Sequence, residues 1–395
     1  MSKRLRVGVI GVGAIATDEV HGHIPNYLRV PDIELVALSD VNGRRARYVA
    51  DRFEIPQVYT HYRDMLARAE LDAVSICTPN YLHAAMAIGC LQAGVHVLVE
   101  KPMALTSESG RRMMEAAQQS GKQLFVGMNN RFRDDTRALK LMVANGALGR
   151  VYSAKAAWLR RYGSPGTSTW FTSKAQAGGG PLWDIGLVML DLALWMLDFP
   201  EAEAIAATIF DSLIDNPEAD EARVGSVECS PYPVEDAANA LIRFKNGSGL
   251  VLEVSSASML GVADDIVLRL DGTHGAAELH NPNMNQKDSL RIHGELFGTR
   301  MDLAPGIPES DIPSHQREVH HFVDVCLGRE APLVSPAQGL AGVQITEAIY
   351  RSAAEGRMVR LDEPTREWAG ESPVSTNGTG NGYACDDERP LEAVA

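Results

Sequence analysis

A glycine-rich segment near the start of the chain has the spacing of a phosphate-binding turn. Gly11, Gly13 and Ala16 form the pattern G-x-G-x-x-A directly after an apolar run. The first glycine permits a tight turn, the second lets the backbone approach a pyrophosphate, and the small third residue keeps the following helix close to the strand. Ala14 and Ile15 begin that helix, where free N–H groups favour anions. The segment predicts a dinucleotide site, and a glycine-bearing turn without a ligand is the alternative.

The acid that ends the second apolar run bears on which dinucleotide binds. At this position the Asp40 carboxylate can accept hydrogen bonds from both ribose hydroxyls, and it repels a 2′-phosphate. Arg44 and Arg45 follow closely and could neutralise a phosphate, or could simply form a solvated helical turn. The sequence therefore predicts NAD as the cofactor, with NADP as the less favoured alternative.

Two triplets with polar side chains follow later apolar runs. They are Thr78-Pro79-Asn80 and Glu100-Lys101-Pro102. If those runs are parallel strands, both triplets lie at carboxyl ends, where open α/β sheets bind ligands. Lys101 stands on backbone held between a strand end and a proline, and beside a nicotinamide it could transfer a proton. The alternative for Lys101 is an ordinary exposed lysine.

Three consecutive glycines, Gly178-Gly179-Gly180, precede an apolar helical segment that carries Asp184. The missing side chains suggest backbone that lies close to a bound ring. The Asp184 carboxylate could bind neighbouring sugar hydroxyls, because a carboxylate accepts from two donors at once. It could equally be a helix N-cap.

The elements that must position these residues change character along the chain. Up to about residue 128, short apolar runs alternate with amphipathic stretches, and Gly94 and Gly121 fall where glycines end helices. This alternation indicates a parallel sheet covered on both faces. The predicted strands are Leu5–Ile10, Ile33–Leu38, Ala73–Cys77, Val95–Val99 and Gln123–Val126, and the predicted helices are Gly43–Phe53, Tyr81–Ala93 and Ser107–Ser120.

After about residue 150 the pattern becomes strands with few helices between them. Lys245-Asn246-Gly247 has the sequence of a hairpin turn. The pattern predicts a first domain over residues 1–128 and a second, α+β domain over residues 129–361 with a largely antiparallel sheet. The predicted strands are Val151–Trp158, Ala204–Phe210, Ala237–Phe244, Gly249–Ala257 and Ile266–Leu270, followed by helices at Gln316–Cys326 and Pro336–Ala354.

Two acidic segments carry nearly all of the net charge of −14 in this chain of 395 residues. Residues 211–235 are polar and acidic and predict a long loop, which is either a functional lid or a solvated insertion. Residues 362–395 predict a disordered acidic tail. The remainder is nearly neutral, and phosphate binding needs concentrated positive charge, so nucleic acid is not an expected partner.

The cysteines and the long apolar runs indicate where in the cell the protein is located. The five cysteines are odd in number and include no C-x-x-C pair, so they predict neither a metal nor a redox site and fit a reducing cytoplasm. The basic N-terminus could imitate a signal peptide, but glycines interrupt the apolar stretch that follows. The longest later apolar run, Gly186–Leu197, contains Asp191 and is shorter than a membrane span of about 20 residues. The prediction is a cytoplasmic protein that does not bind a membrane.

Taken together, the glycine pattern, Asp40, both triplets and the segment Gly178–Asp191 resemble the glucose–fructose oxidoreductase/inositol dehydrogenase/rhizopine-catabolism family, Gfo/Idh/MocA. The resemblance covers about residues 5–361, and the Glu-Lys-Pro triplet is its most specific element. It implies an α/β Rossmann domain followed by an α+β domain with an open-faced, mainly antiparallel sheet. It also implies a sugar or cyclitol substrate, and a homodimer or homotetramer packed through the open sheet.

The resemblance further implies roles for residues by their position. Lys101 is then the catalytic lysine and Asp184 orients the substrate. Trp170 and Phe171 match a segment near the nicotinamide, with ordinary core aromatics as the alternative. The implied cofactor contacts, beyond the glycine turn and Asp40, are Thr78, Asn80, His83, Glu100, Lys101, Asn129 and Trp170, and the implied substrate contacts are Lys101, Arg131, Asp184 and Val188.

One position departs from the family pattern, which is commonly Asp-x-Gly-x-His-x-x-Asp with the histidine as acid/base. Val188 stands where that histidine is found, one helical turn from Asp184 and on the same face. Valine cannot move a proton. Either Lys101 does the acid–base work alone, helped by Tyr162, His315 or a water, or the protein is not a conventional dehydrogenase.

The leading hypothesis is an NAD(H)-dependent oxidoreductase that interconverts a secondary alcohol and a ketone on a sugar, a sugar derivative or a cyclitol. Two alternatives stay open. One is a catalytically silent nucleotide-binding regulatory protein on the same fold, which Val188 favours and the intact pair of Lys101 and Asp184 opposes. The other is an enzyme that cleaves glycosides through transient oxidation.

Overall fold

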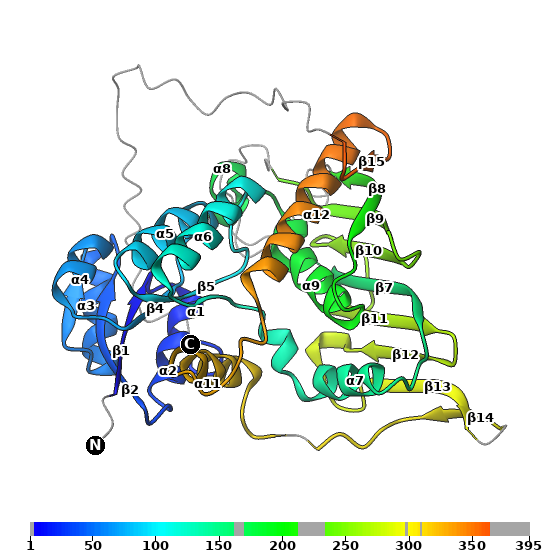
Figure 1. Ribbon diagram of the computed structural model, residues 1–395, viewed down its shortest axis with the longest axis horizontal. Helices are drawn as coiled ribbons and strands as arrows, with labels where there is room; N and C mark the ends of the chain where they lie inside the picture. The colour runs from blue at the N-terminus through cyan, green and yellow to red at the C-terminus, as the bar shows by residue number, and fades with distance from the viewer. Residues whose placement is uncertain (1–3, 162–169, 212–233, 297–298, 309, 364–395) are drawn as a thin grey trace. The chain divides into compact units, whose positions relative to one another are not determined.

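The first sheet, sheet A, is parallel and comes from the N-terminal third of the chain. The computed structural model describes residues 4–161, 170–211, 234–296, 299–308 and 310–363. The strand order of sheet A is β3-β2-β1-β4-β5-β6, so the direction of winding reverses between β1 and β4 (Figure 1). The strands are β1 (Leu5–Ile10), β2 (Ile33–Ser39), β3 (Gln57–Tyr59), β4 (Ala73–Ile76), β5 (His96–Val99) and β6 (Leu124–Val126).

The helices of this region confirm the predicted strand–helix alternation. Asn42 caps α3 by accepting from the Arg45 N–H, and Thr106 caps α6 by accepting from the Ser109 N–H. The prediction missed β3, α2 and α4, because so few residues cannot show a period. The helices are α1 (Ala14–Thr17), α2 (His23–Tyr27), α3 (Gly43–Phe53), α4 (Tyr62–Arg68), α5 (His83–Gln92) and α6 (Ser107–Ser120).

The second sheet, sheet B, has the order β14-β13-β12-β11-β7-β10-β9-β8-β15. All neighbours are antiparallel except β7 and β10, which confirms a mainly antiparallel sheet. Gly247, with φ +84°, turns the chain between β9 and β10 in the predicted hairpin. The strands are β7 (Val151–Arg160), β8 (Ala202–Phe210), β9 (Ala237–Phe244), β10 (Gly249–Ser255), β11 (Asp264–Gly272), β12 (Gly275–His280), β13 (Leu290–Leu296), β14 (Thr299–Leu303) and β15 (Val359–Arg360).

The sequence did not predict β12, β13 and β14. Every residue of β14 is exposed, so no alternation of apolar and polar residues marks that strand. Within the described residues, this half of the chain contains the predicted helices α11 (Ser314–Cys326) and α12 (Pro336–Glu355) and the predicted apolar helix after the three glycines, α9 (Leu187–Met196). It also contains α7 (Asp134–Ala144) and α8 (Lys174–Ala177), which the sequence did not predict.

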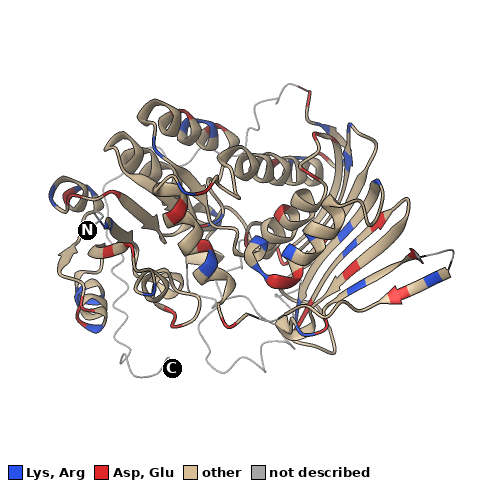
Figure 2. Cartoon of the chain, turned by 60° about the horizontal axis from the view of Figure 1, so that its bottom comes forward, with Lys and Arg blue, Asp and Glu red and all other residues tan. Residues whose placement is uncertain are grey.

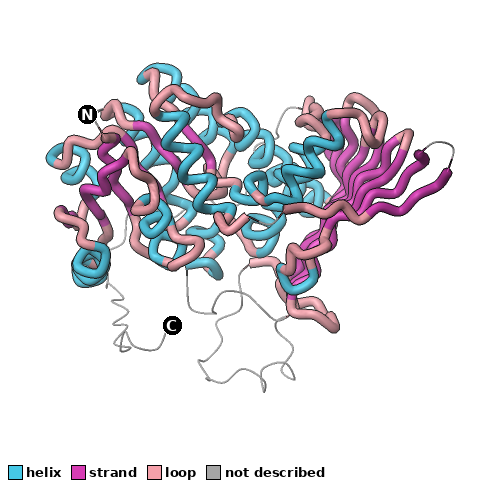
Figure 3. Tube along the Cα trace, turned by 90° about the horizontal axis from the view of Figure 1, so that it is seen from below, coloured by secondary structure: helices cyan, strands magenta, loops and turns pink. Residues whose placement is uncertain are grey.

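The two faces of sheet B differ. Helices α9 and α12 pack against one face, on β7, β8 and β10 (Figure 3). Buried and exposed residues alternate along β9, so its exposed residues point to the other face of the sheet. Leu241 of β9 is one of them, and it pairs directly with Val251 of β10, which is exposed as well. Lys, Arg, Asp and Glu residues are spread along the strands of sheet B (Figure 2), and Lys155 and Glu253 form an ion pair at 2.6 Å. Sheet B is therefore open on one side within the described chain.

One segment of the described chain, Lys174–Met196, is long and apolar enough to cross a membrane by length and composition alone. Its apolar window is 83% buried inside the protein, which is the environment of a central core helix. The predicted acidic loop and the predicted tail fall almost wholly outside the described residues, which omit 212–233 and 364–395.

Candidate active site

The glycine-rich turn leaves room where a dinucleotide phosphate would lie. Gly11 has φ +86°, and a Cβ there would stand 2.6 Å from the Cys77 carbonyl oxygen, so this residue must be glycine. A Cβ on Gly13 would meet nothing within 4 Å. The helix that starts at Ala14 ends after one turn at Thr17. The turn therefore fits a pyrophosphate in front of Gly13, and this fit rests on the open space at that glycine.

Asp40 lies beside the same turn, directly after β2. Its Oδ2 accepts from the Val12 N–H at 2.9 Å and its Oδ1 accepts from the Asn42 N–H at 2.8 Å. The carboxylate thus holds the turn in place and stays half-exposed. A ribose that follows a pyrophosphate at Gly13 would reach this edge of the sheet.

Lys101 and Asp184 meet between the two sheets. Lys101 follows β5 of sheet A, whereas Asp184 precedes α9, which covers sheet B. Nζ of Lys101 lies 2.6 Å from Oδ1 of Asp184 and 3.1 Å from its carbonyl oxygen. The two side chains are 24% and 26% exposed, so the pair is accessible from one side. The structure brings together the two residues that the sequence placed at the centre of the chemistry.

The charge state of Asp184 follows from its surroundings. Burial favours the protonated carboxyl, but the positive charge and hydrogen bond of Lys101 and the positive charge of Arg160 outweigh burial and lower the pKa of Asp184. Arg160 ends β7, donates to Asp264 at 3.0 Å and lies over the Trp158 ring. At neutral pH Asp184 is a carboxylate that can accept hydrogen bonds from substrate hydroxyls.

Asp184 sits in a single π-helical turn, Leu182–Gly186, that leads into α9. The alternative of a helix N-cap is therefore wrong. Turns of this type insert one residue into a helix and are frequent at functional sites. In the stretch 182–196 every residue is buried except Asp184 and Val188. The partial exposure that these two residues share supports the predicted common face, which stays a prediction.

The three glycines before this turn contact protein. A Cβ on Gly179 would stand 2.0 Å from the Tyr350 hydroxyl, and one on Gly180 would stand 2.1 Å from the Glu235 carbonyl oxygen. The sequence suggested that the absent side chains of these glycines make room for a bound ring. The structure instead places Tyr350 of α12 and Glu235, in the segment before β9, where the side chains of Gly179 and Gly180 would be.

Two expected ligand contacts are corrected by burial. Arg131 has no exposed side-chain surface. Its guanidinium donates to the two carboxylate oxygens of Asp191 at 2.8 and 2.5 Å and to Oε1 of Gln338 at 2.8 Å. His83 is fully buried, and its ring nitrogens lie 2.7 Å from the carbonyl oxygens of Pro102 and Thr78. Burial lowers the pKa of His83. Both side chains join segments of the protein around the site, and neither has exposed surface for a ligand.

The remaining expected contacts, Thr78, Asn80 and Trp170, differ in their burial and partners. Asn80 donates to the Ala177 carbonyl at 2.9 Å and so joins the end of β4 to α8. Trp170 is half-buried and stacks on Phe171 with ring centroids 3.9 Å apart. Thr78 is half-buried at the end of β4.

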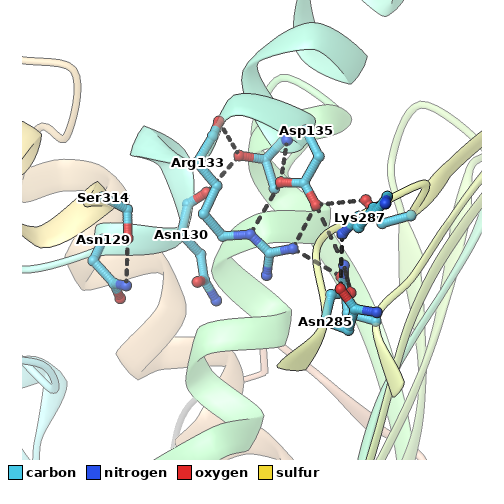
Figure 4. Close-up of polar contacts among 10 residues, drawn as sticks. Asn129, Asn130, Arg133, Asp135, Asn285, Lys287 and Ser314 are labelled. Carbon is cyan, nitrogen blue, oxygen red and sulfur yellow. Dashed lines mark hydrogen bonds and ion pairs between the residues drawn. The ribbon is translucent and has the colours of Figure 1, made fainter. Parts of the chain in front are cut away.

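Asn129 begins the chain segment that leaves sheet A. Its amide donates to the Ser314 hydroxyl at 3.3 Å, as Figure 4 shows. Nearby, the buried Arg133 donates to Asp135 at 2.5 and 3.0 Å, and the Ser289 hydroxyl also donates to Asp135. This network joins α7 to the loop before β13, and all of its charges are paired.

Sequence reasoning missed a buried hydrogen-bonded chain behind Lys101. Glu100 Oε2 accepts from the Lys101 N–H at 3.2 Å, and its Oε1 lies 2.9 Å from His23 Nε2. His23 Nδ1 contacts the Ser75 hydroxyl, which also contacts the Tyr27 hydroxyl at 2.8 Å. A lone histidine in a five-residue helix carries no recognisable signal, so only the fold reveals this chain.

Two more titratable groups interact with Glu100: His315, which the sequence offered as a helper of Lys101, and Glu318, which sequence reasoning missed. Burial lowers the pKa of His315 to about 4, so it is neutral at pH 7. Burial and the charge of Glu100 raise the pKa of Glu318 to about 8, and Glu318 accepts from the Met128 N–H at 2.5 Å. Among the described residues, no group of three or more His, Cys, Asp or Glu is arranged to hold a metal ion.

Comparison with known proteins agrees with this geometry. Residues 5–128 match the family model described as an oxidoreductase family with an NAD-binding Rossmann fold, and residues 136–278 match its C-terminal domain model. The chain is 34% identical to the D-glucoside 3-dehydrogenase of Escherichia coli over 91% of this chain and 98% of that protein. It is 32% identical to the 1,5-anhydro-D-fructose reductase of Ensifer adhaerens over 90% of this chain and 98% of that protein.

Solved structures share the fold. GenD2 from gentamicin A biosynthesis, in complex with NAD, superposes with a TM-score of 0.72 and 28% identity, covering 92% of this chain and 98% of that chain. Levoglucosan dehydrogenase in complex with NADH gives a TM-score of 0.77 at 23% identity, covering 91% of this chain and all of that chain. The chain therefore belongs to the Gfo/Idh/MocA family of oxidoreductases with an NAD-binding Rossmann fold.

Proposed function

We propose that this NAD-dependent oxidoreductase interconverts a secondary hydroxyl and a ketone on a sugar, a sugar derivative or a cyclitol. The observation that carries the proposal is the contact of Lys101 Nζ with Asp184 Oδ1 at 2.6 Å, at the carboxyl end of β5. Relatives named D-glucoside 3-dehydrogenase, 1,5-anhydro-D-fructose reductase and myo-inositol 2-dehydrogenase support the substrate class. A glucoside is the first substrate to test.

The cofactor contacts are proposed from the turn and the strand ends. Gly11, Gly13, Ala14 and Ile15 would hold the pyrophosphate, and Asp40 would accept from the ribose hydroxyls. Thr78, Asn80, Glu100 and Lys101 follow the carboxyl ends of β4 and β5, on the edge where a nicotinamide would lie. Asn129 and Trp170 are proposed as further contacts of the cofactor. NAD, when bound, supplies the hydride acceptor.

Lys101 would take the hydroxyl proton during oxidation and return it during reduction. In oxidation Lys101 acts as the neutral amine, to which the substrate hydroxyl donates, and the ammonium formed is the acid of the reverse reaction. In the structure Nζ donates to Asp184, which places the two groups side by side at the proposed site of the reacting hydroxyl. Asp184 would hold a hydroxyl next to the reacting one. Val188 contributes no proton, and Tyr162 lies outside the described residues.

The test is a rate measurement with NAD⁺ and a panel of glucosides, anhydrosugars and inositols, following NADH absorbance. We expect at least one of them to reduce NAD⁺, and a Lys101→Met variant to lose that rate. Release of an aglycone without net NADH would select the glycoside-cleaving alternative. Tight NADH binding with no turnover on any polyol, or on the matching ketones, would contradict the proposal and favour the regulatory alternative.

We also propose a homo-oligomer packed through the open face of sheet B, and a cytoplasmic location. The oligomer is supported by the exposed Leu241 and Val251, which pair across β9 and β10 on that face. The location is supported by the cysteine pattern of the sequence.

A further inference from the structure

A buried carboxylate that the reaction does not use lies behind the turn that carries Asp184. Glu235 is 5% exposed, and its Oε1 accepts from the Leu182 N–H at 3.1 Å and from the Tyr350 hydroxyl at 2.7 Å. Leu182 is the first residue of the π-helical turn. Glu235 thus satisfies an N–H group that the start of a helix leaves without a partner.

The glycines give this carboxylate and its tyrosine partner access to the turn. A side chain on Gly179 would collide with the Tyr350 hydroxyl, and one on Gly180 would collide with the Glu235 carbonyl oxygen. Tyr350 also stacks on Trp183 of the turn, with ring centroids 6.4 Å apart. The turn is therefore packed from behind against the Tyr350 side chain and the Glu235 main chain, at two positions that only glycine can occupy.

Glu235 is itself fixed to sheet B. The next residue, Asp236, donates its N–H to the Phe210 carbonyl at 2.7 Å, and its carbonyl accepts from the Ser256 N–H at 2.9 Å. Burial raises the pKa of Glu235, while the Gly180 N–H and the Tyr350 hydroxyl act in the opposite direction. The carboxyl group links a rigid strand end to the turn two residues before Asp184.

We propose that Glu235 is a positioning residue that sets the place of the Asp184 carboxylate opposite Lys101, with Tyr350 orienting Glu235. The inference deepens the proposed function and rests on it for its kinetic consequences. Glu235 touches no reacting atom. It acts through the Leu182 N–H and the π-helical turn on Asp184. In this way it aligns Asp184, next to the helix that covers sheet B, with Lys101, which follows a strand of sheet A.

The experiment compares full-length Glu235→Ala, Glu235→Gln and Tyr350→Phe with wild type. Glutamine keeps the oxygen that accepts from Leu182 and Tyr350, so its kcat/KM should stay within about threefold of wild type. Alanine removes this acceptor, and a displacement of about 1 Å at Asp184 should lower kcat/KM by about 10- to 100-fold. The kcat/KM of Tyr350→Phe should lie between the values of the glutamine and the alanine variants. The Kd of NADH should be unchanged in all three.

A matched control separates positioning from general stability. Glu347, on the same helix as Tyr350, accepts from the Ser107 N–H at 3.0 Å at the start of α6, away from Asp184. Glu347→Ala should lower the melting temperature and leave kcat/KM unchanged. An equal loss of kcat/KM in Glu347→Ala, or wild-type kcat/KM in Glu235→Ala, would overturn the inference. If Glu235→Ala does not fold, wild-type kcat/KM in Tyr350→Phe would overturn it.

A crystal structure of Glu235→Ala, or of Tyr350→Phe if the first does not fold, tests the inference without any activity. We expect the Nζ–Oδ1 contact between Lys101 and Asp184 to open beyond hydrogen-bond distance in the alanine variant and to lengthen in the phenylalanine variant. An unchanged turn and contact would overturn the positioning role. If no sugar is oxidised by wild type, the proposed function fails, and the crystal structure still decides whether Glu235 positions Asp184.

Discussion

At the scale of single residues, Lys101 is the group whose removal should separate binding from chemistry. In Lys101→Met we expect the Kd of NADH to be retained and kcat to fall by about 10²- to 10⁴-fold, the usual contribution of general acid–base catalysis. Methionine approximates the length of lysine but cannot carry a proton. Fluorescence titration with NADH and initial rates on an active sugar measure the two effects.

Val188→Ala is the matched control for this prediction. It removes apolar surface from the same opening and no ionisable group, so its kcat should remain within about tenfold of wild type. A Lys101→Met variant that turns over as fast as Val188→Ala would show that another group moves the proton.

Asp40 provides a second test at the residue scale. The carboxylate repels a 2′-phosphate, so wild type should bind NADH more tightly than NADPH, and Asp40→Ala should narrow the difference. Arg44 and Arg45 work against the repulsion. Alanine also removes the acceptor for the Val12 N–H, so some loss of NADH affinity is expected as well. Titration of wild type and Asp40→Ala with NADH and with NADPH measures these affinities. Equal affinities in wild type would mean that Asp40 does not select the cofactor.

At the scale of elements, α11 carries a buried acid whose titration should be visible in stability. Burial, the charge of Glu100 and, least, the charge of Asp191 raise the pKa of Glu318 to about 8, although the positive charge of His23 and the hydrogen bond from the Met128 N–H lower it. Below about pH 4.5 the carboxyl is protonated in both the folded and the unfolded state, so its contribution to stability is fully present. As pH rises towards 8 the unfolded chain loses the proton first, and that contribution is lost.

Glu318→Gln should remove this pH dependence. Glutamine keeps an oxygen that can accept from the Met128 N–H, and it does not ionise. Relative to the variant, the free energy of unfolding of wild type should fall by about 1.4 kcal/mol per pH unit between pH 5 and pH 8. Urea unfolding of both proteins across this range measures the difference. A difference that stays constant with pH would show that Glu318 ionises normally in the fold.

At the scale of the whole molecule, the open face of sheet B should mediate self-association. A double substitution Leu241→Lys and Val251→Lys places like charges next to each other on that face, because the two residues are directly paired. We expect light scattering after size exclusion to show a smaller species with an unchanged circular dichroism spectrum. A wild-type chain that is monomeric at assay concentration would contradict the proposed oligomer.

The division of the chain after residue 128 into a cofactor domain and a substrate domain stays a prediction. The family models, which cover residues 5–128 and 136–278, support it. The structure groups the chain up to Leu361 in one compact unit, because contacts such as Lys101–Asp184 and Asn80–Ala177 join the two halves.

The sequence by itself determined the parallel sheet, most of its strands and the cofactor turn. These features depend on local patterns: apolar runs of strand length, glycines where the backbone must turn, and an acid at a strand end. The bounds of β1, α3 and α6 were predicted to the residue for this reason. Lys101 and Asp184 also stand in distinctive local sequences, but their roles came from the resemblance to the family and stay predictions.

Only the tertiary structure decided what those residues face. Arg131 and His83 have binding chemistry in the sequence, yet Asp191 and two carbonyl oxygens occupy them completely. Gly179 leaves room for Tyr350, which lies 171 residues later in the chain, and Gly180 leaves room for Glu235, which lies 55 residues later. A local pattern shows what a side chain can do, whereas its partners come from distant segments that the fold brings to it.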